Sequence, residues 1–248
     1  LDTSAQFGPL VKPIITPRFV PSCTSELMTG LAKLAKEYDV PVQSHLSENH
    51  GEIDWVASLH PESSNYTDVY YEHHLMGTVP TVMAHCIHLS DVEMDRMAET
   101  QTMVSHCPYS NVNLSSGIAP IRKLIERNIP IGLGSDISGG HIVSMAKVLT
   151  EAIGLSKMKW AEVDPNYAPL TLSEAFYMAT KGGGQFFGHV GSFEKGYELD
   201  ALIIDDTSLF DPNERSLEER LERWLYVGDD RHIIERYVAG RVVPSPKG

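Results

Sequence analysis

Several features that would assign this chain to a large class of proteins are missing from its sequence. No run of apolar residues approaches 18 positions, although apolar residues make up 42% of the 248 residues. This pattern excludes a membrane-spanning helix, and the apolar content argues against intrinsic disorder. The three cysteines are an odd number, which fits a disulfide scaffold poorly and favours a reducing compartment. We therefore expect a cytoplasmic protein without a membrane partner.

Basic residues are also in deficit. The chain carries 33 acidic and 20 basic side chains, so its formal net charge is −13. Nucleic-acid affinity depends on clustered lysine and arginine side chains that neutralise phosphates. The charge balance therefore argues against a nucleic-acid partner and favours a small-molecule substrate.

Three motifs of familiar sites are absent as well. No G-x-G-x-x-G glycine pattern follows a predicted strand, so a dinucleotide site is unsupported. The sequence contains no H-E-x-x-H and no P-C-x-x-C. These absences set aside the zincin proteases and the cytidine-deaminase type of zinc site.

Short β-rich runs alternate with amphipathic helices through most of the chain. Strands are predicted over 10–16, 40–45, 79–85, 102–106 and 129–136, and helices over 24–38, 90–99, 118–127 and from 171 to the glycines at 182–184. Capping boxes open the helices at Ser90 and Thr171. In the first helix we expect Leu27, Leu31, Leu34 and Ala35 to form the apolar stripe. This alternation predicts an α/β fold with a mainly parallel sheet.

The pattern changes beyond about residue 188. Two β-type runs, 196–204 and 236–243, flank a charged helix over 214–224, with no crossover helix. We therefore predict one domain over 1–187 and a small, separate β element over 188–248.

Polar residues recur where the predicted strands end. They are Arg18, His45, His85, His106 and Asp136. The carboxyl ends of parallel strands meet at one face, which is the active-site face of a (β/α)₈ barrel. An open doubly wound sheet would also bind its ligand there.

The candidate chemistry lies in four of these segments. His45 could bind a metal ion, and Glu48 could reach a water held by that ion. Asp136 could bind the same ion and hold a nucleophilic water, or it could serve as a helix cap or turn residue. A lone histidine such as His85 is more often a core residue, and His106 could act directly or structurally. Together these residues favour a metal-assisted hydrolase, in which a bound ion makes water acidic and a carboxylate moves protons.

Pro17-Arg18-Phe19 follows the first predicted strand. Arg18 could donate two parallel hydrogen bonds to a carbonyl and the adjacent ring atom of a ligand. Phe19 could stack on a planar heterocycle. A surface arginine beside a core phenylalanine is the plainer alternative.

Six segments together resemble the amidohydrolase superfamily and, within it, the guanine deaminases of the eukaryotic type. They are VKPIITPRFVPSC, VQSHLSEN, VMAHCIHLS, SHCPYSNVNLSSG, IGLGSDISGG and YVGDDRHIIERYVAGRVV. The H-x-x-E, HCPxSN and Gly-Ser-Asp segments are shared by many amidohydrolase deaminases. The PRF triplet and the YVGDDR-type segment single out the guanine deaminases.

The resemblance implies a fold and a reaction. The fold would be the later strands of a TIM-type (β/α)₈ barrel over 1–187, with part of a small β-sandwich over 188–248. The reaction would be zinc-dependent hydrolysis of guanine to xanthine and ammonia, with one Zn²⁺ per subunit and iron as the alternative ion. The resemblance also suggests a homodimer.

The resemblance also implies a role for each candidate residue. His45 and Asp136 would be zinc ligands that also contact the substrate. Glu48 would shuttle protons to the ring and to the leaving ammonia, and Asp136 would take a proton from the attacking water. His85 would hydrogen-bond that water or the substrate. Arg18 would bind the carbonyl edge of guanine and Phe19 its face.

One part of the family pattern is missing: two further zinc ligands in an H-x-H motif on the first barrel strand. The sequence contains no such motif, and only five barrel strands are predicted where eight are required. We therefore expect this chain to be the C-terminal part of a longer one. The alternatives are another amidohydrolase, acting on S-adenosylhomocysteine, cytosine or a triazine, and a non-catalytic fragment with a scaffold role.

Overall fold

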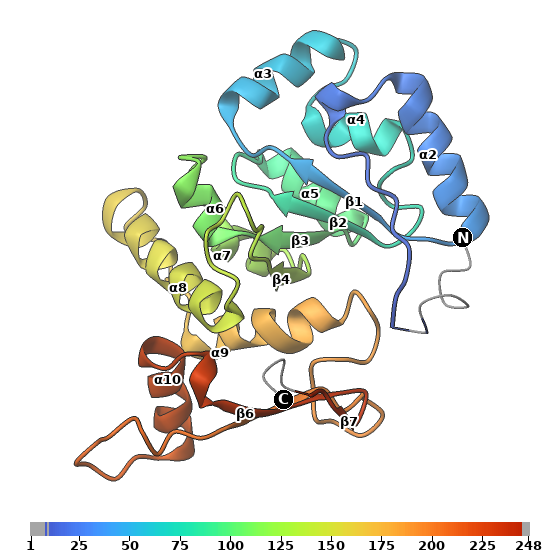
Figure 1. Cartoon of the computed structure of the whole chain (residues 1–248). Coiled ribbons are helices and arrows are strands. Elements are labelled where there is room, and N and C mark those ends of the chain that lie inside the picture. Colours follow the sequence, from blue (N-terminus) through green and yellow to red (C-terminus); the bar gives the residue numbers. More distant parts are fainter. Residues whose placement is uncertain (1–7, 9, 245–248) are drawn as a thin grey trace. The chain divides into compact units, whose positions relative to one another are not determined.

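The structure is a computed structural model that describes residue 8 and residues 10–244. The chain forms two compact units (Figure 1). The first comprises Leu1–His106 and Ala119–Ile131, and the second Cys107–Ile118 and Gly132–Gly248. The Ile131/Gly132 boundary falls within a strand.

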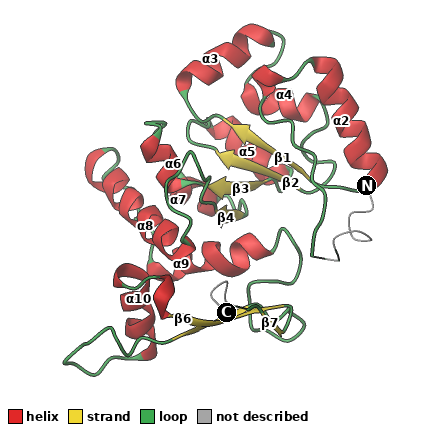
Figure 2. Ribbon diagram, in the orientation of Figure 1, coloured by secondary structure: helices red, strands yellow, loops and turns green. Residues whose placement is uncertain are grey.

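Parallel strands alternate with helices in the first unit, as the sequence predicts (Figure 2). The sheet has the order β1-β2-β3-β4, and β1 pairs with β2, and β2 with β3, in parallel. The strands are β1 (Val42–Leu46), β2 (Thr81–His85), β3 (Met103–His106) and β4 (Ile131–Leu133). The helices of this unit are α2 (Ser25–Tyr38), α3 (His50–Leu59), α4 (Tyr66–Glu72), α5 (Asp91–Glu99) and α7 (Ile121–Glu126), with a 3₁₀ turn at Val20–Ser22.

The strand predicted over 10–16 is wrong in extent. Only Ile15 pairs with the sheet, through a parallel bridge to Val42. The Ile15 amide donates to the Pro41 carbonyl and its carbonyl accepts from the Gln43 amide, both at 2.9 Å. Pro13 and Pro17 lack amide hydrogens and cannot continue the ladder. Four strands and one bridge therefore stand where five strands were expected.

Helix α2 begins and ends where predicted, but of the predicted apolar stripe only Ala35 is buried, and the assignment of Leu27 and Leu34 to it is wrong. Thr24 caps the helix by accepting a hydrogen bond from the Leu27 amide at 3.2 Å. The buried residues are Met28, Ala32 and Ala35, whereas Leu27 and Leu34 are 46% and 42% exposed. A face with the spacing i, i+4, i+7 starting at Met28 is one residue out of phase with Leu27 and Leu34.

The capping boxes at Ser90 and Thr171 are confirmed. The helix predicted over 118–127 is shorter, because Pro120 stands at its N-cap and α7 begins at Ile121. At Ser90 and Thr171, by contrast, the capping boxes satisfy amide hydrogens that the first helical turn leaves without partners.

The second unit combines helices with a small antiparallel sheet. Its helices are α6 (Pro108–Asn113), α8 (Met145–Glu162), α9 (Leu172–Tyr177), which continues as a π-helical turn (Met178–Gly182), and α10 (Leu217–Val227). Helix α8 was not predicted. Strands β5 (Ala201–Ile204), β6 (Ile233–Val238) and β7 (Arg241–Val242) pair antiparallel in the order β5-β6-β7, and a 3₁₀ turn (Asp230–His232) precedes β6. The β element predicted after residue 188 is thus present, while the boundary between 187 and 188 stays a prediction.

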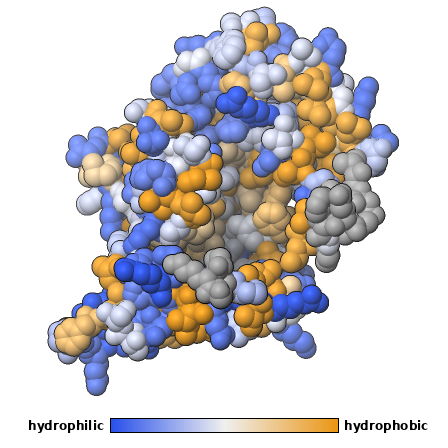
Figure 3. Space-filling model, in the orientation of Figure 1, coloured by the Kyte–Doolittle hydropathy of each residue, from blue (hydrophilic) through white to orange (hydrophobic). Residues whose placement is uncertain are grey.

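Apolar side chains reach the surface of the antiparallel sheet. Leu202, Ile203 and Ile234 are 50%, 43% and 57% exposed. Figure 3 shows orange apolar atoms among polar ones on the face in view. A sheet of three short strands cannot bury both of its own faces. None of the described helices is both long enough and apolar enough to cross a membrane.

Met28 and Leu27 allow a test of the phase of α2. Met28 is fully buried, so Met28→Ala should lower the free energy of unfolding by about 2–5 kcal/mol. Leu27→Ala, a matched change on the neighbouring residue, should alter it by no more than about 0.5 kcal/mol. Urea unfolding measures both, and equal losses would contradict the assigned buried face.

Candidate functional site

Three histidines lie at the carboxyl ends of adjacent strands in the first unit. His45 is the penultimate residue of β1, His85 ends β2 and His106 ends β3. The parallel register places Leu46 opposite His85. The predicted gathering of these histidines at one edge of the sheet is therefore confirmed. It follows from the parallel ladder, which aligns strand ends that are far apart in sequence.

The orientation of His45 is set by the Arg18 carbonyl. This oxygen accepts from the His45 backbone amide at 3.1 Å and lies 2.6 Å from its Nδ1. Because a carbonyl oxygen only accepts hydrogen bonds, Nδ1 carries the hydrogen in this contact. A neutral imidazole then keeps its lone pair on Nε2, the arrangement found in metal-binding histidines.

Glu48 and His85 approach each other beside His45. Glu48 Oε2 lies 3.7 Å from His85 Nε2, and the side chains are 17% and 1% exposed. The rings of His45 and His85 stack, with centroids 5.2 Å apart and planes 27° apart. His85 has φ = +70°, a left-handed conformation that costs energy in a residue with a β-carbon. At 3.7 Å the two atoms are within ion-pair distance, which requires a protonated imidazole.

His106 is buried and neutral. Burial, followed by the neighbouring His85, lowers its pKa to about 3. Its Nδ1 is buried without a hydrogen-bond partner among the described residues. The sequence left a direct and a structural role open, and a neutral imidazole with an unsatisfied nitrogen is compatible with both.

Arg18 and Phe19 lie together at the end of the segment that pairs with β1. The Arg18 guanidinium carbon is 5.2 Å from the Phe19 ring centroid. Trp55 of α3 meets Phe19 edge to face, with centroids 6.1 Å apart. Arg18 is exposed and Phe19 half-buried, so both can meet a ligand. Trp55 was not predicted, because nothing in the spacing of α3 marks it.

Asp136 lies in the second unit, in a tight turn after β4. The Gly140 amide donates to its carbonyl at 2.6 Å. A β-carbon on Gly139 would lie 2.6 Å from Asp136 Oδ2 and 2.7 Å from Ser110 Oγ. Ser110 Oγ is buried without a hydrogen-bond partner among the described residues. The turn thus forms a polar cradle around the carboxylate that only glycine leaves open.

These observations fit a metal ion only in part. His45 presents an unprotonated Nε2, and Asp136 stands beside the Gly139 cradle. Within residues 8 and 10–244, no three His, Cys, Asp or Glu side chains gather as a metal-binding group. A structural zinc site needs four ligands and a catalytic one at least three. The described residues therefore do not form a metal site by themselves.

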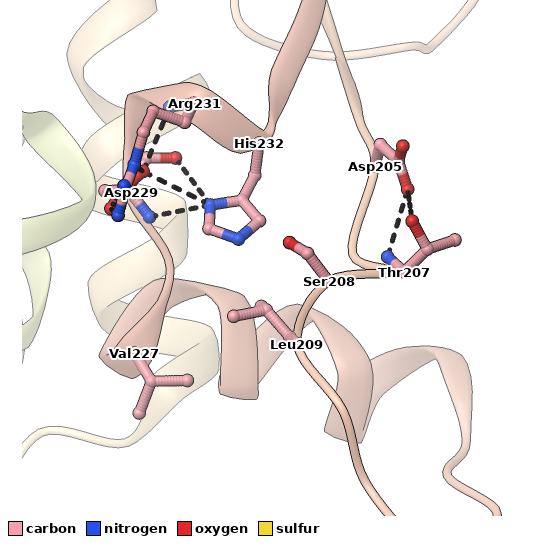
Figure 4. A pocket seen from close by; sticks show the side chains of 8 residues that line it. All are labelled: Asp205, Thr207, Ser208, Leu209, Val227, Asp229, Arg231 and His232. Carbon is pink, nitrogen blue, oxygen red and sulfur yellow. Dashed lines mark hydrogen bonds and ion pairs between the residues drawn. The ribbon is translucent and has the colours of Figure 1, made fainter.

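A pocket in the second unit was not predicted (Figure 4). It is lined by Asp205, Thr207, Ser208, Leu209, Val227, Asp229, Arg231 and His232. Its charged groups bind one another. The Arg231 guanidinium donates to both Asp229 oxygens at 2.6–3.1 Å, and Thr207 donates to Asp205 at 2.7 Å. The Asp229 carboxylate is thus paired with Arg231, and the Asp205 carboxylate with Thr207.

Nearly the whole chain matches a protein-family model. The model of the Amidohydrolase family matches residues 4–243, and the parallel sheet with histidines at its strand ends agrees with that match. The chain belongs to the amidohydrolase family, and its α/β fold is of the TIM-barrel type.

Its relatives narrow this class further. The chain is 45% identical to the guanine deaminase of Dictyostelium discoideum over 96% of this chain and 54% of that protein. It is 42% identical to the guanine deaminase of Mus musculus over 95% and 54%. The chain is also similar to a crystal structure of guanine deaminase from C. acetobutylicum with bound guanine in the active site. The two share 55% sequence identity and superpose with a TM-score of 0.92, and the match covers 94% of this chain and 56% of that one. The chain thus spans about half the length of the relatives it matches.

Burial of His106 predicts a pH dependence of stability. Its folded pKa of about 3 lies below the usual value of about 6.5. Between these values the unfolded state binds a proton that the folded state does not. Stability is therefore complete above about pH 6.5 and falls by up to about 1.4 kcal/mol per pH unit as the pH drops.

We expect His106→Asn to reduce this slope in urea unfolding between pH 7 and pH 5. The control is His74→Asn, since His74 is exposed and its φ of +59° suits asparagine. Equal slopes in wild type and His106→Asn would contradict the buried, neutral histidine.

Proposed function

We propose that the protein containing this chain hydrolyses guanine to xanthine and ammonia. The observation that carries the proposal is the cluster at the strand ends, in which Glu48 lies 3.7 Å from His85 and His45 presents its Nε2. The similarity to guanine deaminases, one of them described with guanine in its active site, supports this substrate.

Each candidate residue has a role in this proposal. Glu48 carries a proton to the purine ring and then to the leaving ammonia, because a half-buried carboxylate beside an imidazole can both accept and donate it. His85 hydrogen-bonds the attacking water or the substrate. The Arg18 guanidinium donates to the carbonyl edge of guanine, and Phe19, held edge-on by Trp55, packs against its face.

His45 and Asp136 are the proposed metal ligands, and both would also contact the substrate. One Zn²⁺ per subunit is the proposed ion, with iron as the alternative. When bound, such an ion lowers the pKa of water toward about 7 and so supplies hydroxide at neutral pH. Asp136 then accepts the proton of the attacking water.

The remaining ligands are proposed to come from an upstream H-x-H motif in a longer chain. The support is that the chain covers only about half the length of each relative. In that chain, residues 1–187 form the later part of the barrel and 188–248 part of a small β-sandwich. We further propose a cytoplasmic homodimer, on the family resemblance alone.

Arg18→Ala tests the pocket assignment. Losing a charged hydrogen-bond donor worth about 1.5–3 kcal/mol should lower kcat/KM for guanine by about 10- to 100-fold. Metal content should be unchanged, because His45 is held by the backbone carbonyl of Arg18 and not by its side chain. Steady-state kinetics and elemental analysis of the longest natural chain measure both, with the exposed Arg241→Ala as control.

Unchanged kcat/KM in Arg18→Ala would refute this pocket. Turnover of S-adenosylhomocysteine, cytosine or a triazine in preference to guanine by the wild type would instead refute the proposed substrate. A full-length protein that turns over none of these would favour the scaffold alternative.

Gly139→Ala tests the position of Asp136. The new β-carbon would stand 2.6 Å from Asp136 Oδ2, so the carboxylate must move. Since a displacement of about 1 Å can cost about 100-fold in rate, we expect kcat to fall between about 10- and 100-fold. Gly154→Ala in α8 meets no atom within 4 Å and should leave kcat unchanged. Full activity in Gly139→Ala would remove Asp136 from the site.

A further inference from the structure

Glu52 of α3 connects Glu48 to a neighbouring helix. Its side chain is 7% exposed. Oε2 accepts from the Glu48 amide at 2.9 Å and from the Asn49 amide at 3.4 Å. Oε1 accepts from the Tyr66 hydroxyl at 2.7 Å. Both carboxylate oxygens of Glu52 are therefore occupied, and one of them fixes the backbone of the proposed proton carrier.

The other capping boxes of the chain show that this use of Glu52 is unusual. In α5, α9 and α10 the acidic residue accepts from the N-cap amide itself, at 2.8 Å in each case. In α3 Glu52 accepts only a long bond of 3.4 Å from the amide of its N-cap residue, Asn49. Its short bond, of 2.9 Å, comes from the amide of the preceding residue, Glu48. Capping alone does not require this shift.

Tyr70 makes a corresponding connection to His45. Its hydroxyl donates to the His45 carbonyl at 2.9 Å and lies 2.6 Å from Ser44 Oγ. Ser44 Oγ in turn lies 2.8 Å from the Pro17 carbonyl. Tyr70 is fully buried. Through these bonds it joins the end of β1 to the segment that carries Arg18.

The two tyrosines form one rigid unit. They are one helical turn apart on α4, and their rings stack with centroids 5.6 Å apart and planes 15° apart. Tyr66 is 3% exposed and Tyr70 fully buried. Burial raises the pKa of both hydroxyls, so both stay protonated donors throughout the range in which proteins work.

We propose that Tyr66 and Tyr70 are positioning residues for the reaction: Tyr66, through Glu52, sets the Glu48 carboxylate, and Tyr70 sets the His45 imidazole. The assignment rests on the proposed function for the roles of Glu48 and His45. One short helix thus fixes both ends of the His45-Leu46-Ser47-Glu48 segment.

The two tyrosines should affect different measurements. Tyr70 acts on a metal ligand, so Tyr70→Phe should weaken binding of Zn²⁺ about tenfold, the lower end for residues that orient ligands. Tyr66 acts on the proton carrier, so Tyr66→Phe should lower kcat about tenfold with KM and Zn²⁺ affinity within about twofold. Phenylalanine keeps the stacked ring in both variants.

Glu52→Met should reproduce Tyr66→Phe. Methionine is similar in size to glutamate but has no carboxylate oxygen, so the bonds from Tyr66 and from the Glu48 amide are both lost. Both changes break the same connection, so their effects should not add. The kcat of the double variant should lie within about twofold of the kcat of either single variant. Tyr71→Phe is the matched control, since Tyr71 lies on the same helix but is 40% exposed with its ring against Arg96.

The experiment combines kinetics on guanine, titration of Zn²⁺ against a chelator, and hydrogen exchange of the peptide containing the Glu48 amide, all in the longest natural chain. We expect exchange of that amide to quicken about tenfold in Tyr66→Phe and Glu52→Met but not in Tyr71→Phe. The positioning role is overturned if exchange is unchanged. It is also overturned if the variants lose thermal stability while kcat and Zn²⁺ affinity stay at wild-type values.

Failure of the proposed function would look different. A wild type that does not turn over guanine refutes the reaction. Amide exchange at Glu48 and Zn²⁺ affinity in Tyr70→Phe do not depend on turnover, and they still decide whether the tyrosines hold these two residues.

Discussion

The Arg18 carbonyl, which accepts from both the amide and Nδ1 of His45, is the interaction on which the rest of the site depends. It joins the segment before α2 to the end of β1. It favours the tautomer with the hydrogen on Nδ1, and it ties the backbone of Arg18 to the histidine. In the proposed function, one backbone oxygen would therefore couple metal binding to substrate recognition.

The surroundings of this interaction are built to keep it in place. The parallel register of β1 and β2 brings His85 next to His45 and within 3.7 Å of Glu48. Buried Tyr70 bonds to the His45 carbonyl, and Glu52 holds the Glu48 amide. Preorganised groups of this kind need not rearrange during a reaction, which is where most of the catalytic benefit of a polar site arises.

Much of this organisation could be predicted from the sequence, because it depends on residue type and spacing. Alternating elements indicated the parallel sheet, which placed His45, His85 and His106 at one edge, and capping boxes marked α5 and α9. The supporting contacts could not be predicted. The bonds from His45 and Tyr70 end on backbone carbonyls, which every residue has. The buried face of α2 was misjudged because Met28 and Leu27 fit an apolar stripe equally well until packing decides between them.

The tautomer of His45 is the most direct test of the contact between the Arg18 carbonyl and His45 Nδ1. Long-range ¹H–¹⁵N correlation of histidine-labelled protein, with His45→Gln used to assign the signal, reports which ring nitrogen carries the hydrogen. We expect hydrogen on Nδ1 near pH 7, with the Nε2 resonance moving when Zn²⁺ is added to the longest natural chain. Hydrogen on Nε2, with no change on adding Zn²⁺, would contradict it.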